Sequence, residues 1–95
     1  MDKNQIFKLC NSIIQSGRNY STKVASPSPL MYAYHGTEYL GAAHGLAGIL
    51  LILLCFPDYL RQNPESEQSV KGSIDYLLSI QKANGFFLHN IKNIF

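Results

Sequence analysis

The 95-residue sequence predicts an all-α fold, and three observations lead to that prediction. Apolar residues recur at helical spacing over residues 4–16. A long apolar run without any charged residue covers residues 46–56. A third segment opens with Asn63-Pro64-Glu65, a combination typical of a helix start. No segment supports a strand. We therefore predict three helices, at about residues 4–16, 43–56 and 64–82, joined by two loops.

The composition describes one small domain or a piece of a larger one. Charged residues make up 15% of the chain, against roughly 25% in typical soluble domains. A surface this poor in charge indicates that more protein covers part of it. The formal charge is +2, and the Lys and Arg residues are scattered rather than clustered, so we expect no nucleic-acid partner.

The first predicted helix shows the apolar stripe of an amphipathic helix, with most of its polar residues off that stripe. The stripe consists of Ile6, Phe7, Leu9, Cys10, Ile13 and Ile14. Gly17 is the predicted stop, because glycine adopts the left-handed conformation of a helix C-terminus without steric cost. Residues 18–41 are predicted as a loop, since each proline in "SPSP" biases the preceding serine away from helical geometry.

The central segment Leu46–Phe56, "LAGILLILLCF", is apolar on every side of a helix. A helix of this kind is buried in protein or in lipid. Two amphipathic neighbours, each offering one stripe, cannot surround it, so we expect further protein to cover it. A membrane span stays open as the alternative, although Leu40–Phe56 is short of the roughly 20 residues needed and lacks asymmetric Lys/Arg flanks. Pro57 and Asp58 are predicted to end the helix.

The third predicted helix begins with Asn63 as its cap and Pro64 in its first turn, and Asn84-Gly85 closes it. Its inner stripe is predicted to contain Val70, Ile74, Leu77, Leu78 and Gln81. Residues 85–95 show no period and form an irregular tail in this prediction. A short connection between the second and third helices suits an antiparallel helical hairpin.

Cys10 and Cys55 are expected to be buried, reduced thiols of an intracellular protein, with a disulfide as the alternative. There is no closely spaced set of Cys and His ligands, so we predict no metal site in this chain. The N-terminus lacks the pattern of a secretory signal. These observations predict a cytoplasmic location, with membrane association possible through the central segment.

His44 is the main candidate for chemistry. It lies in Gly41-Ala42-Ala43-His44-Gly45, where small side chains allow a ligand or another backbone to approach closely. The positive end of a helix dipole favours the neutral imidazole, which can donate or accept a proton. Two interpretations stay open at this point: a catalytic acid or base, and a histidine that joins a loop to a helix start through hydrogen bonds.

Other candidates surround this segment. His35 and Glu38 accompany three tyrosines, and such hydroxyl-tipped rings either line clefts or pack loops onto a core. These tyrosines are Tyr32, Tyr34 and Tyr39. For substrate contact, the candidates are Tyr39, Gly41 and Gly45.

The run "SPLMYAYHGTEYLGAAHGLAGILLILLCF", followed by "VKGSIDYLLSIQKANGFF", resembles the eukaryotic LanC-like proteins, relatives of bacterial lanthionine cyclases. Gly41–Gly48 is the most specific part, and the resemblance extends over Leu30–Phe87. It implies part of an α/α toroid of seven helical hairpins arranged in two rings, of which this chain supplies three helices. The remaining helices of such a toroid would cover residues 46–56.

The resemblance also implies a chemistry. Zinc in these proteins activates a thiol, glutathione in the LanC-like branch, for addition to a dehydrated serine or threonine of a peptide. The histidine of the Ala-His-Gly motif is a proposed acid/base, and that role falls on His44. The family's zinc ligands, a cysteine and a later Cys-His pair, follow this motif and have no match here. We therefore expect an internal fragment or truncated product that is inactive alone. A non-catalytic interaction or scaffold protein is the alternative.

Overall fold

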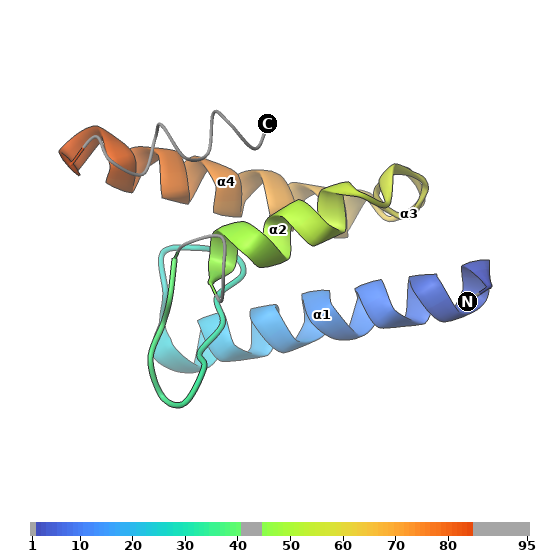
Figure 1. The fold of residues 1–95 in the computed structure, drawn as a ribbon, viewed down its shortest axis with the longest axis horizontal. Coiled ribbons are helices and arrows are strands. Elements are labelled where there is room, and N and C mark those ends of the chain that lie inside the picture. The colour runs from blue at the N-terminus through green and yellow to red at the C-terminus, as the bar shows by residue number, and fades with distance from the viewer. Residues whose placement is uncertain (1, 41–44, 85–95) are drawn as a thin grey trace.

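The computed structural model describes residues 2–40 and 45–84 and shows four α-helices (Figure 1). They are α1 (Lys3–Val24), α2 (Leu46–Leu54), α3 (Pro57–Gln62) and α4 (Pro64–Asn84). Within these residues there is no strand, and the only β-type pairing is one isolated bridge between Tyr34 and Thr37. The predicted all-α class is confirmed. The predicted tail, residues 85–95, lies outside the described residues.

Helix α1 begins with a capping box. The Asp2 carboxylate accepts from the Gln5 backbone N–H at 2.8 Å, and the Gln5 side-chain oxygen accepts from the Asp2 N–H at 3.1 Å. The helix continues to Val24 and ends at Ala25, whose φ is 54°. The predicted stop at Gly17 and the predicted loop start at residue 18 are therefore wrong. Gly17 lies inside the helix, at a position where a bulkier residue would collide with a neighbouring segment.

That neighbour is Tyr32, which crosses α1 at Gly17. Its hydroxyl donates to the Ile13 carbonyl at 2.7 Å, and the Met31 N–H donates to the Gly17 carbonyl at 3.2 Å. A Cβ atom at Gly17 would overlap the Cζ and Oη atoms of Tyr32 and would lie 2.9 Å from Cε1. Glycine is thus required here for close approach rather than for helix termination.

We expect Gly17→Ala to lower the free energy of unfolding by about 1–2 kcal/mol, the overpacking cost less the higher helix propensity of alanine. Urea unfolding followed by circular dichroism measures this. Ser16→Ala, at an exposed position of the same helix, is the matched control and should be neutral or slightly stabilising. Equal gains in both variants would show that Tyr32 does not pack tightly on Gly17.

The buried face of α1 also differs from the predicted stripe. Cys10 and Ile14 are buried as predicted, but Leu9 is 47% exposed. The buried face continues instead through Gly17 and Ser21. Small and polar residues carry no hydrophobic signal, so the periodicity of large apolar residues could not show this continuation.

Helix α2 is shorter than predicted and ends at Leu54. Pro57 and Asp58 do not simply end it, because Pro57 occupies the first turn of the additional helix α3. The break between the two helices turns the chain, and Cys55 becomes exposed. The prediction of a buried Cys55 is therefore wrong, whereas Cys10 is buried; both thiols are free.

Helix α4 begins at Pro64, as predicted. Asn63 does not cap it through its side chain; its amide Nδ2 donates to the Tyr59 carbonyl at 2.8 Å. Val70 and Leu77 are buried and Ile74 and Leu78 are half-buried, which confirms the stripe at these four positions. At the fifth position, Gln81, only the helical backbone is described, so this part of the predicted stripe stays a prediction. Two buried serines of α4, Ser66 and Ser73, were not predicted.

In Figure 1, α2 lies between α1 and α4. Its buried side chains belong to one hydrophobic core with residues of both of these helices. Leu46, Ala47, Leu50 and Leu53 are buried in that core. Ile52, on another side of α2, is 51% exposed. The helices of this chain thus cover one side of α2 and leave another open. Among the helices of residues 2–40 and 45–84, none combines the length and the apolar composition that a membrane span requires.

Candidate functional site

The segment between α1 and α2 is held by a network of buried serine hydroxyls. Ser73 of α4 accepts from the Leu30 N–H at 3.0 Å, and the Ser28 hydroxyl donates to the Leu30 carbonyl at 2.6 Å. The Ser21 hydroxyl of α1 donates to the Ser28 carbonyl. Each of these buried polar groups therefore has a partner, as a stable buried loop requires. The network joins the start of this segment to both long helices.

A tight turn follows at Tyr34–Thr37. The Tyr34 N–H donates to the Thr37 carbonyl at 2.8 Å, and the Thr37 N–H donates to the Tyr34 carbonyl at 3.0 Å. Between them, His35 has φ 50° and Gly36 has φ 78°. Positive φ at both central residues marks a type I′ turn. His35 is an exposed residue of this turn. The sequence signal that could have indicated the turn is the dipeptide His35-Gly36.

The residues on both sides of the His44 segment are anchored. The Leu46 N–H donates to the Tyr39 carbonyl at 2.9 Å, and the Ala47 N–H donates to the Leu40 carbonyl at 3.2 Å. Gly45 is buried and forms the N-cap of α2. The first two backbone donors of α2 are thus satisfied by the chain itself and are not available to a ligand. His44 and Gly41 lie outside the described residues, so their roles stay predictions.

The aromatic residues next to this anchor divide into two groups. Tyr34, His35 and Tyr39 gather: the Tyr34 ring centroid lies 4.2 Å from that of His35 and 6.4 Å from that of Tyr39. Tyr39, a predicted substrate contact, is 44% exposed. Tyr32 instead packs on α1, as described above. The predicted tyrosine cluster is therefore only partly assembled.

Glu38 is fixed by α1. Its carboxylate accepts a hydrogen bond from the Tyr20 hydroxyl at 2.7 Å. This bond requires the protonated phenol, so it raises the pKa of Tyr20 above its ordinary value. This hydrogen bond connects Glu38 to α1 and thereby orients the residues that lead to the His44 segment.

Tyr32 makes the stability of the protein sensitive to alkaline pH. Burial raises the pKa of Tyr32 well above its ordinary value, and the nearby Arg18 charge opposes this only in part. The folded state therefore binds this proton more tightly than the unfolded chain. Its contribution is complete below the unfolded value of about 10 and is lost as the pH rises further.

We expect Tyr32→Phe to cost about 0.5–1.5 kcal/mol of unfolding free energy at pH 7.5, because the bond to the Ile13 carbonyl is lost. From pH 9 to 11 the variant should lose less additional stability than the unmodified chain. Urea unfolding at both pH values measures the difference. The exposed Tyr39→Phe serves as control and should retain the full alkaline loss.

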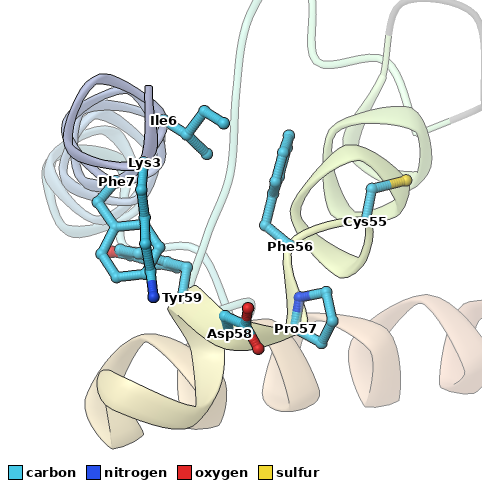
Figure 2. A pocket seen from close by; sticks show the side chains of 8 residues that line it. All are labelled: Lys3, Ile6, Phe7, Cys55, Phe56, Pro57, Asp58 and Tyr59. Carbon is cyan, nitrogen blue, oxygen red and sulfur yellow. The ribbon is translucent and has the colours of Figure 1, made fainter. Parts of the chain in front are cut away.

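A separate apolar pocket lies where the start of α1 meets the junction of α2 and α3 (Figure 2). Its volume is about 230 Å³. The Phe7 and Tyr59 rings form one wall as an edge-to-face pair with centroids 5.3 Å apart. Figure 2 shows the Cys55 sulfur directed away from Ile6 and Phe7. The thiol therefore does not face the apolar wall, and the charged side chains that line the pocket are Lys3 and Asp58.

Residues 2–40 and 45–84 contain no group of three or more His, Cys, Asp or Glu side chains that could hold a metal ion. The two described cysteines do not form a site either, since Cys10 is buried in the core and Cys55 is exposed on another part of the fold. The donor set of these residues therefore does not fit zinc.

The architecture defines the chain as an all-helical unit with a glycine-rich, histidine-containing connection at the start of its central helix. A sequence profile described as lanthionine synthetase C-like protein matches residues 1–93. The chain therefore belongs to the lanthionine synthetase C-like family, whose members adopt an α/α toroid.

Two relatives illustrate the relationship. The chain is 35% identical over 82 residues to glutathione S-transferase LANCL1 of Danio rerio, a match that covers 84% of the chain and 20% of that protein. It is 47% identical over 51 residues to the LanC-like protein GCL1 of Arabidopsis thaliana, covering 54% of the chain and 11% of that protein. The chain thus spans a fifth or less of these relatives. No solved structure matches it significantly.

Proposed function

We propose that this chain is one segment of a LanC-like protein that binds glutathione and adds its thiol to dehydrated serine or threonine residues of a peptide. The match to the Danio rerio protein supports the use of glutathione, since that relative is named as a glutathione S-transferase. The peptide substrate follows from the family resemblance. The single observation that carries the proposal is the family match over nearly the whole chain.

In this reaction the thiol sulfur forms a bond to the β-carbon of the dehydrated residue. The π bond between the α- and β-carbons breaks, and its electron pair takes a proton at the α-carbon. The proton given up by the thiol balances the one gained by carbon. His44 is the group of this chain that holds or moves such a proton. It directly precedes Gly45, the N-cap of α2, in the sequence.

The described residues do not fit zinc, and no step through a metal is assigned to them. In a whole LanC-like protein the zinc ligands would come from other parts of the chain. This segment would then contribute His44, the anchored backbone of Tyr39 and Gly45 around it, and α2 as a support. By itself it would be inactive. The free thiols of Cys10 and Cys55 suit a reducing compartment such as the cytoplasm.

The exposed side of α2 supports a second candidate, a non-catalytic interaction protein. Ile52 of α2 is a large apolar side chain that is about half exposed, and so is Leu9 of α1. In a toroid, further helices would cover them; in an interaction protein, a separate partner would do so. The two candidates differ in one expected result: only the first predicts glutathione transfer when this segment is placed in a whole LanC-like protein.

A chimera tests the proposal. The matching residues of the Danio rerio protein are replaced by those of this chain, and glutathione addition to a dehydroalanine peptide is followed by mass spectrometry. The chimera should add glutathione well above the uncatalysed rate, whereas the isolated chain should not, with or without added zinc. A chimera that melts cooperatively but transfers nothing would contradict the proposal and favour the interaction protein.

A further inference from the structure

Arg18 of α1 is a half-buried cation that has no carboxylate partner within residues 2–40 and 45–84. Its Nε and Nη2 atoms donate to the Ser69 hydroxyl oxygen at 3.2 and 3.0 Å. The ion pairs of the described residues lie elsewhere, between Arg61 and Asp58 and between Lys71 and Glu67. A guanidinium carries five donors in a fixed plane, so one hydroxyl leaves most of its capacity unused.

The position of this guanidinium is fixed by α4. The Ser69 hydroxyl donates its own proton to the Glu65 carbonyl at 3.1 Å, and its lone pairs are therefore the part that faces Arg18. A side chain held in this way loses little further entropy when it binds a ligand. The remaining donors of Arg18 are thus preorganised rather than free to sample many rotamers.

These donors line a polar pocket of about 510 Å³ between α1, the end of α3 and the start of α4. Its volume lies within the roughly 300–1,000 Å³ typical of small-molecule sites. Apart from Arg18, its polar walls are provided by Asn11, Gln62, Asn63, Glu65 and Ser66.

Buried Tyr59 fixes the orientation of two side-chain amides in these walls, those of Asn11 and Asn63. Its hydroxyl donates to the Asn11 Oδ1 at 2.5 Å, and its carbonyl accepts from the Asn63 Nδ2 at 2.8 Å. The remaining amide groups are therefore a donor, the Nδ2 of Asn11, and an acceptor, the Oδ1 of Asn63. The pocket thus presents both kinds of polar group in fixed orientations.

The pocket also presents both charges, since Arg18 and Glu65 line it without forming an ion pair with each other. We infer that this pocket binds a small zwitterion, a free amino acid or a dipeptide, with its carboxylate on Arg18 and its ammonium group on Glu65. The planar guanidinium matches a carboxylate with two parallel hydrogen bonds. A simple anion would be repelled by Glu65, and an apolar ligand would leave the Asn11 and Asn63 amides without partners.

This inference does not rest on the proposed function, because it needs neither a metal nor His44. Glycylglycine is the probe, titrated into the isotope-labelled 95-residue chain while backbone amide shifts are recorded by NMR. We expect saturable shifts at Asn11, Arg18 and the first turn of α4. Arg18→Gln should weaken binding about tenfold or more, and Arg18→Lys should weaken it less.

Arg61→Gln is the matched control, since this exposed arginine pairs with Asp58 outside the pocket, and it should leave the affinity unchanged. Should Arg18→Gln unfold the chain, the exposed Glu65→Gln decides: it should weaken glycylglycine binding but not that of N-acetylglycine, which lacks the ammonium group. Shifts that stay linear, that spread outside the pocket, or that respond equally to the Arg18 and Arg61 variants would overturn the inference.

Discussion

Leu50→Ala is expected to lower the free energy of unfolding by about 2–5 kcal/mol, the range found when a large aliphatic side chain is removed from a packed core. Leu50 lies in the middle of α2 and is fully buried in the core shared with α1 and α4. Small domains are stable by only about 5–15 kcal/mol, so this one truncation should remove a large part of the total. Urea unfolding followed by circular dichroism measures the loss.

Ile52→Ala is the matched control, because it removes a side chain of the same size from the same helix. Ile52 is 51% exposed, and its truncation should cost less than about 1 kcal/mol in the monomeric chain. Both variants shorten a branched aliphatic side chain of α2 to a methyl group, and neither adds a polar group. Equal losses at the two positions would show that the side of α2 bearing Ile52 is covered in solution, which contradicts the one-sided packing described here.

This pair of variants also separates what the sequence could and could not predict about α2. The uncharged run from Leu46 predicted a helix that needs cover on every side, and periodicity predicted a partner stripe on α4 at Val70 and Leu77. Which side of α2 is covered depends on how α1 and α4 approach it. That is a property of the tertiary fold, and an all-apolar helix carries no pattern that reveals it.

The errors at helix boundaries have a common physical origin. Gly17 has the residue type of a helix end, yet it serves the contact with Tyr32, and local propensity cannot anticipate a contact between segments. Cys55 was placed in the apolar run, but Pro57 starts a new helix and the turn before it exposes the thiol. Ser73 was not predicted because its role is to accept from the Leu30 N–H, far away along the chain.

For the candidate site, the sequence located the histidine segment but not its supports. The Gly-Ala-Ala-His-Gly pattern predicted a helix start at about residue 43, whereas the structure places the N-cap at Gly45 and the first helical residue at Leu46. The supports of this segment are the type I′ turn at His35 and Gly36, the hydrogen bond from Tyr20 to Glu38 and the two backbone hydrogen bonds of α2. Each of them depends on the geometry of the folded chain. Residue types alone do not specify such pairings, so the anchoring of the segment could be found only in three dimensions.

In the chimera with the Danio rerio protein, we expect His44→Ala to reduce glutathione addition by about 10²–10⁴-fold while the melting temperature stays nearly unchanged. A positioned general acid or base contributes a factor of this size. The anchors of the segment are backbone bonds from Leu46 to Tyr39 and from Ala47 to Leu40, which do not use the histidine side chain. The loss should therefore appear in turnover rather than in folding, and the limb of the pH–rate profile that reports its ionisation should flatten.

His35→Asn is the matched control for that experiment, since it removes the other histidine of the same connection. Asparagine tolerates the positive φ at this turn position, so the change should preserve the fold. His35 lies exposed beside Tyr34, and its loss should leave turnover within about threefold, because effects of general acid–base catalysis begin at much larger factors. If His44→Ala instead lowered the melting temperature strongly and left the rate per folded molecule unchanged, His44 would be a structural residue that joins the loop to α2.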